Sequence, residues 1–132
     1  MNRTIVHDPL FLALPSTPAS QEDLPTAQDL RDTLQANQAG CVGLAANMIG
    51  VRKRIIIAMG LVMLNPEIVS KQSPYEAEEG CLSLSGLRKT RRYNKIEVTW
   101  QDEDMKPHCQ WFEGYMAQVI QHEVDHCEGV LI

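Results

Sequence analysis

The strongest constraint in this sequence is a segment near its carboxyl end that reads His122-Glu123-Val124-Asp125-His126. The spacing of apolar residues predicts a helix from Gly114 to Cys127, and Gly129 follows where a left-handed residue would end it. Residues four apart share one face of a helix, so the two imidazoles can bind one metal ion. Glu123 flanks that face and can reach a water molecule on the ion, whereas Asp125 is expected to be solvated or capping.

Two histidines leave a catalytic metal short of a ligand, because such sites usually have three protein ligands and a water molecule. The sequence has four cysteines, and none forms a CxxC pair, which excludes a zinc ribbon and a dithiol redox motif. Cys81 is the preferred third ligand, since it follows Gly80, where the backbone can turn closely around an ion. The alternative for any single cysteine is a small buried hydrophobic residue.

Length and charge limit the function further. A chain of 132 residues with 44% hydrophobic residues is expected to form a single domain spanning residues 1–132. Its net charge of −5 disfavours binding to nucleic acid or to an anionic membrane surface. The apolar run at residues 10–14 is too short for a signal peptide, and no stretch approaches the length of a membrane span. We therefore expect a cytoplasmic protein with reduced thiols.

The remaining pattern predicts an α+β domain with a mostly antiparallel sheet packed around the carboxy-terminal helix. Residues 1–20 are punctuated by prolines and are expected to be an extended arm, followed by an amphipathic helix at about 24–39. Strands are expected at residues 54–58, 61–64, 96–100 and 108–112. The first pair should end at Asn65-Pro66, and residues 71–75 are expected to form a polar turn.

Three segments stand out in the order in which they occur along the chain. They are Gly43-Leu44-Ala45-Ala46, Glu79-Gly80-Cys81-Leu82-Ser83 and Gln121 to His126. With these segments the chain resembles the peptide deformylase family. The family has a GxGLAAxQ loop, an EGCLS segment and a QHExDH helix in the same order. The second and third match, and Asn65-Pro66-Glu67 resembles the family's NP-containing strand region. The chain thus resembles this family over nearly its whole length.

The resemblance implies a metal-dependent amide hydrolase that acts in protein biosynthesis by processing the N-terminal methionine. Cys81, His122 and His126 would hold one divalent metal ion, typically Fe²⁺ in this family, with Zn²⁺, Ni²⁺ or Co²⁺ as substitutes. Glu123 would take a proton from water and pass it to the departing amine. The implied substrate is an N-formylmethionyl peptide, and nascent chains at the ribosome are implied partners.

The first motif departs from the family pattern at two positions beside the expected reaction. The family stabilises the developing oxyanion with the backbone N–H after the cysteine ligand, here Leu82, and with the glutamine of the first motif, here replaced by Met48. A thioether cannot donate a hydrogen bond, so a water or the Asn47 side chain would have to replace that donor. Cys41 stands in place of a glycine and is expected to be a tolerated small residue rather than a soft ligand.

The resemblance also implies a set of substrate contacts. Backbone groups near Gly43 would bind an extended peptide as an added strand, and residues on the face of His122 would border a methionine pocket. The full set is Val42, Gly43, Leu44, Met48, Arg88, Tyr115 and Val119. Glu79 is expected to pair with Arg92 in a structural role, and Arg88 to Arg92 otherwise form a solvated basic stretch. The chain ends six residues after His126, where many family members continue, and this difference is expected to affect only the periphery.

Three other functions remain open beside the one that the resemblance implies, and the first of them also rests on the resemblance. The first is a catalytically weak or inactive protein that binds metal and formylmethionyl peptides. The second is a structural metal that ties the Cys81 loop to the last helix, with a closed four-ligand shell. The third, an endopeptidase of the zincin type, is less favoured, because its third ligand normally lies downstream of the helix.

Overall fold

A computed structural model describes all 132 residues. The helices are α1 (Pro9–Leu12), α2 (Leu24–Ala36) and α3 (Gly114–Cys127), with short 3-10 turns η1 (Gln21–Asp23) and η2 (Ala46–Ile49). The strands are β1 (Gly43–Ala45), β2 (Ile55–Ala58), β3 (Leu61–Glu79), β4 (Arg88–Gln101) and β5 (Pro107–Glu113). They form one sheet in the order β1-β2-β3-β4-β5, and every neighbouring pair is antiparallel. The predicted α+β fold with an antiparallel sheet is confirmed.

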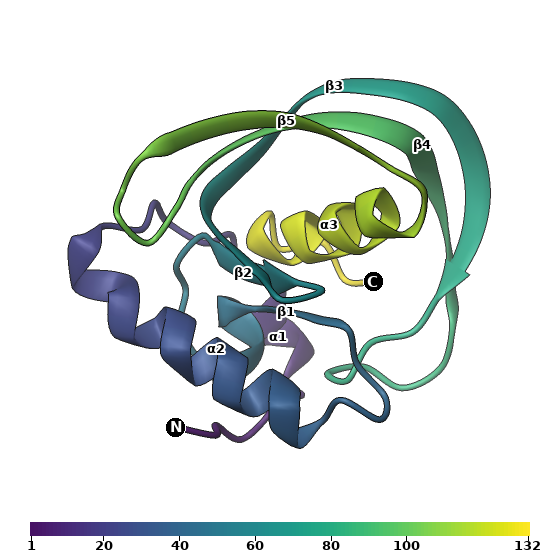
Figure 1. Ribbon diagram of the computed structural model, residues 1–132. Coiled ribbons are helices and arrows are strands. Elements are labelled where there is room, and N and C mark those ends of the chain that lie inside the picture. The colour runs from purple at the N-terminus through teal and green to yellow at the C-terminus, as the bar shows by residue number, and fades with distance from the viewer.

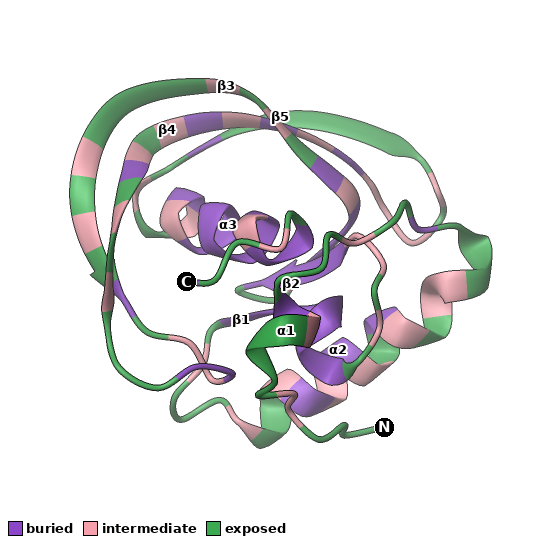
Figure 2. Cartoon of the chain, turned by 180° about the vertical axis from the view of Figure 1, so that it is seen from behind, coloured by how far each residue is buried: buried purple, intermediate pink, exposed green.

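Helix α3 lies at the centre of the molecule. Strands β3, β4 and β5 arch over it, β1 and β2 lie on its other side, and α2 packs beyond these two short strands (Figure 1). Nine of the fourteen residues of α3 are buried, whereas the outer surface of the arch is largely exposed (Figure 2). A polar sequence such as HExxH in a buried helix needs partners, and these define the functional site.

Gly129 ends α3 as the sequence predicts. Its φ of 76° is left-handed, and its N–H donates to the carbonyl of His126 at 3.1 Å. A Cβ atom here would lie 2.5 Å from the carbonyl oxygen of Ala13, so the amino-terminal arm packs directly against this turn. Glycine is therefore needed for both conformation and space.

Strand β3 corrects two predictions, since neither the break at Asn65-Pro66 nor the polar turn at residues 71–75 exists. A straight strand of 19 residues would span roughly 60 Å, so β3 has to bend within so small a protein. The register shifts between Leu64 and Glu67, where Asn65 has a φ of 53°, and again before Ser70. These bulges let the strand continue past the proline, and the polar residues beyond it pair with β4, a strand of 14 residues.

The amino-terminal half differs from prediction in two smaller ways. The arm contains the short helix α1, capped by Asp8, whose side chain accepts a hydrogen bond from the Leu10 N–H. Helix α2 starts at Leu24 as expected but ends at Ala36, three residues early. Its predicted apolar face is confirmed, because Ala27 and Leu30 are fully buried. Neither these helices nor α3 combine the length and apolar content needed to span a membrane.

Candidate metal and active site

Three side chains converge between the end of β3 and helix α3. The Nε2 atoms of His122 and His126 lie 3.3 Å apart, and the Cys81 Sγ lies 3.3 Å from the His126 Nε2. The three ligand atoms all lie within 4.8 Å of one another. Two ligands of one tetrahedral metal ion are expected to be roughly 3.4 to 3.6 Å apart for nitrogen and sulfur donors. The donor types and their spacing therefore fit a divalent transition metal.

The local structure explains why these atoms meet. His122 and His126 are one helical turn apart on α3, so their rings project in the same direction. β3 ends at Glu79, and the loop that follows carries Cys81 to the same helix. The Ser83 N–H donates to the Cys81 sulfur at 3.4 Å, and the His7 ring contacts the Ser83 carbonyl at 2.9 Å. One hydrogen bond within the loop and one contact with the amino-terminal arm therefore hold the loop in place.

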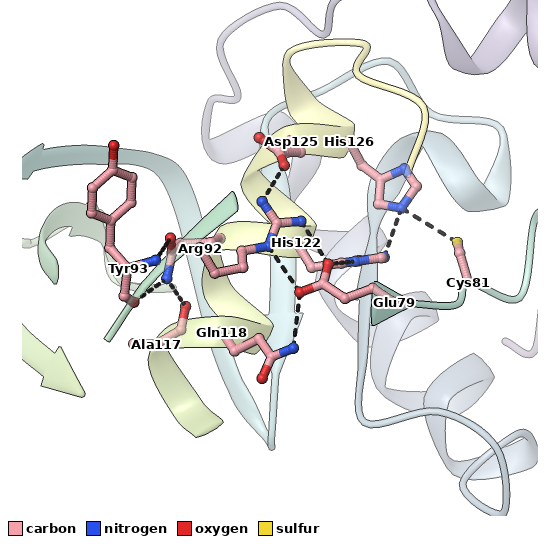
Figure 3. A network of polar contacts seen from close by, with 10 residues as sticks. Glu79, Cys81, Arg92, Tyr93, Ala117, Gln118, His122, Asp125 and His126 are labelled. Carbon is pink, nitrogen blue, oxygen red and sulfur yellow. Dashed lines mark hydrogen bonds and ion pairs between the residues drawn. The ribbon is translucent and has the colours of Figure 1, made fainter. Parts of the chain in front are cut away.

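A buried polar network orients the first histidine (Figure 3). The His122 Nδ1 lies 2.8 Å from a carboxylate oxygen of Glu79. Arg92, which is only 3% exposed, donates two hydrogen bonds to Glu79 and one to Asp125. Gln118 donates a further bond to Glu79 at 2.9 Å. Because a carboxylate on the second ring nitrogen fixes the tautomer of a ligand histidine, Glu79 directs the His122 Nε2 toward the metal position.

The pKa values of these groups follow from their partners. Burial lowers the pKa of His122, but hydrogen bonds with Cys81 and Glu79 outweigh it and raise the pKa to about 10. Burial and the neighbouring charge of His122 lower the pKa of His126 to about 3. In the metal-free protein at physiological pH, His126 is therefore a neutral imidazole and His122 is protonated, so His122 has to release a proton when a metal binds.

Glu123 lies beside the three ligands in a buried position. Its side chain lines a cavity of about 580 Å³, together with Cys81 and His122. One carboxylate oxygen, Oε1, is buried without a hydrogen-bond partner, and burial raises the pKa of this carboxyl to about 7. A carboxylate with a free oxygen and a pKa near neutrality is suited to accept and return a proton. Because a Cβ at Gly43 would lie 2.9 Å from Glu123 Oε2, only glycine lets β1 approach this closely.

The same cavity brings together most of the residues expected to contact substrate. Its lining includes Val42, Gly43, Met48, Leu82, Tyr115 and Val119. Two expected contacts are not part of it. Leu44 is fully buried in the core, and Arg88 lies at the start of β4, where it donates to the Ser85 carbonyl.

The departures in the first motif have distinct positions. Met48 is buried in the cavity wall, where its sulfur accepts a 3.5 Å hydrogen bond from the Ala45 N–H. Cys41 also lines the cavity, but it is not one of the clustered ligands and its thiol donates to the Gly43 carbonyl. Burial raises the pKa of Cys41 to about 11, so it is a protonated thiol. Asn47 faces helix α3 instead of the cavity, which argues against it as the replacement donor.

Comparison with known proteins decides the family. A family model described as polypeptide deformylase matches residues 6–132. The chain belongs to the peptide deformylase family. A peptide deformylase from Clostridium beijerinckii is 52% identical over 136 residues, covering all of both chains. Peptide deformylase 1 from Clostridium perfringens is 40% identical over 111 residues. That alignment covers 79% of this chain and 74% of the relative.

Solved structures of deformylases share the fold. The class I type b peptide deformylase from Acinetobacter baumannii, bound to Met-Ala-Ser, superposes with a TM-score of 0.89 at 26% identity. The match covers 99% of this chain and 97% of the other. The deformylase of the Vibrio parahaemolyticus bacteriophage VP16T, in complex with actinonin, gives 0.89 at 31% identity over the full length of both chains. This chain is therefore a metal-dependent hydrolase by family, with a site built for a divalent ion.

Sequence reasoning missed part of the support of this deformylase site. It expected the Glu79 and Arg92 pair, which is present, but not the contact of Glu79 with His122. It also expected Asp125 to be solvated or capping, whereas this residue pairs with Arg92 at 2.6 Å. The sequence contains one signal for the contact between Glu79 and His122, which is that Glu79 lies only two residues before the ligand Cys81.

Proposed function

We propose that this protein removes the formyl group from the N-terminal methionine of newly made polypeptides. The observation that carries the proposal is the buried Glu123, with one unpaired oxygen, beside the cluster of Cys81, His122 and His126. In a chain of this family, that arrangement supplies a metal site and a proton carrier in one cavity. Hydrolysis of the formyl group would use the metal to activate water and the carboxylate to carry the proton.

The metal would be held by Cys81, His122 and His126. When bound, a divalent ion acidifies a coordinated water and polarises the formyl oxygen. The resemblance to the family favours Fe²⁺ as the bound metal. One thiolate and two imidazoles are also suitable ligands for Zn²⁺, Ni²⁺ or Co²⁺. The contact between Glu79 and the His122 Nδ1 supports this role, because it holds the ring in the ligating tautomer.

Glu123 moves the proton in this mechanism. Its unpaired Oε1 accepts a proton from the attacking water and holds it while the C–N bond is cleaved. It then delivers the same proton to the departing amine, so the products are formate and a free amino terminus. A pKa of about 7 serves both steps at neutral pH.

The peptide is expected to bind along β1. This strand is at one edge of the sheet, so its outer edge can pair with an extended chain through Val42 and Gly43. The cavity lined by Tyr115 and Val119 would receive the methionine side chain. The Met-Ala-Ser and actinonin complexes of similar deformylases support a peptide ligand. We place this reaction in the cytoplasm, on nascent chains at the ribosome.

The oxyanion is expected to be stabilised by fewer donors than the family pattern provides. The Leu82 N–H is available beside Cys81 at the cavity wall, whereas Met48 offers only a sulfur acceptor. Loss of one such donor lowers kcat by roughly 10² to 10³ in other hydrolases. We therefore expect Met48→Gln to raise kcat with little change in KM.

The test measures formate released from formyl-Met-Ala-Ser by protein loaded with Fe²⁺ without oxygen. Glu123→Gln should retain the metal and lose at least roughly 10²-fold in kcat. The matched control is Glu76→Gln, an exposed glutamate on β3 away from the cavity, which should behave as wild type. A metal-loaded wild type that binds the peptide without releasing formate would refute the proposal, as would full activity in Glu123→Gln.

A further inference from the structure

The second ligand histidine lacks the support that the first one has. A histidine that binds a metal through one ring nitrogen almost always donates the N–H of the other to an acceptor. His122 has Glu79 in this position, but the Nδ1 of His126 is buried without any partner. Since the Nε2 of His126 faces Cys81 and His122, its proton has to be on Nδ1 when it binds a metal. A buried donor left unpaired destabilises the state that contains it, so a partner is expected.

The complementary atom belongs to a residue already in contact with His126. Asn47 is 1% exposed, and its Nδ2 donates to the His126 carbonyl at 2.9 Å. The other atom of this amide, Oδ1, is an acceptor that is also buried without a partner. One contacting pair therefore contains an orphan donor and an orphan acceptor. Asn47 lies in η2, which is 79 residues distant from His126 in sequence.

We propose that Asn47 is the positioning residue of His126. Its Nδ2 holds the main chain of the ligand residue, and its Oδ1 accepts the Nδ1 proton of the ring when the metal is bound. The pairing selects the tautomer with a free Nε2 lone pair and limits rotation of the ring. This assignment rests on the metal site of the proposed function, but it concerns no residue that contacts substrate, because Asn47 does not line the cavity.

The test uses the full chain loaded with Zn²⁺ for NMR and with Co²⁺ for absorption spectra. In wild type, the Nδ1 proton of His126 should exchange slowly and appear downfield in ¹H–¹⁵N spectra. Asn47→Leu should remove this signal and speed the release of Co²⁺ to a chelator by roughly 10- to 100-fold. Asn47→Ala is a second substitution that removes the acceptor without adding bulk, and it should have the same two effects.

The control is Thr33→Val on α2, which removes the buried hydroxyl that accepts a hydrogen bond from the Arg3 N–H and does not belong to the cluster. It should leave the Co²⁺ spectrum and the release rate unchanged. The inference is overturned if both Asn47→Leu and Asn47→Ala keep the slow proton and the wild-type release rate. A wild type that binds neither metal would instead refute the proposed function, so the two failures are distinguishable.

Discussion

A Glu79→Gln substitution would measure how strongly the buried network holds its central carboxylate. The change keeps the side-chain shape and removes the charge. In wild type, Glu79 accepts hydrogen bonds from His122, Arg92 and Gln118 at 2.7 to 2.9 Å. The glutamine would leave Arg92 with the half-buried Asp125 as its one remaining carboxylate partner. We expect a large loss of stability at neutral pH.

The magnitude follows from the pKa of Glu79. Burial alone raises this pKa, but the hydrogen bonds from His122, Arg92 and Gln118 lower it from 4.5 to about 2. The difference corresponds to about 3 kcal/mol of folding free energy. Because the folded-state pKa is the lower one, this contribution is complete above pH 4.5 and is lost as the pH falls toward 2. The same figure is within the range expected when one partner of a buried ion pair is removed.

Urea unfolding of the metal-free protein, followed by far-ultraviolet circular dichroism, would test this at pH 7 and at several lower pH values. The free energy of unfolding should fall by about 3 kcal/mol at pH 7, and the difference from wild type should shrink below pH 4.5. The exposed pair of Glu76 and Arg91, 3.6 Å apart on the same two strands, supplies the control. Glu76→Gln should cost at most about 0.5 kcal/mol. A loss under 1 kcal/mol for Glu79→Gln, or one independent of pH, would refute the reasoning.

Three further predictions concern the close packing and the metal. Gly43→Ala should displace Glu123 and reduce kcat for formate release at least roughly tenfold, whereas Gly40→Ala, where a Cβ meets open space, should leave kcat unchanged. Equal activities of the two variants would contradict this. Gly129→Ala should lower stability by at least about 2 kcal/mol in urea unfolding, and by more than Gly60→Ala, which has a similar φ but no neighbour within 4 Å. Saturating Zn²⁺ should raise the melting temperature, with about 1.4 kcal/mol gained for each tenfold rise in free metal above Kd; calorimetry showing no dependence on concentration would argue against the site.

The sequence alone determined the elements whose information is local. The helix from Gly114 to Cys127 and its stop at Gly129 follow from spacing and a single glycine, and both are present. The short buried strands were found because runs such as Ile55 to Ala58 are strongly β-forming. His122, Glu123 and His126 were identified for the same reason, since their relation is fixed by one turn of helix.

Tertiary structure decided whatever depends on partners distant in sequence. The polar half of β3, from Ser70 to Glu79, has no apolar pattern of its own, and it is a strand because β4 pairs with it at nine registered positions. Asp125 and Asn47 look like ordinary polar residues until the fold brings Arg92 to the first and the His126 carbonyl to the second. Local patterns encode backbone preference, whereas the partner of a buried polar group is set by the path of the whole chain, and only the folded structure contains that path.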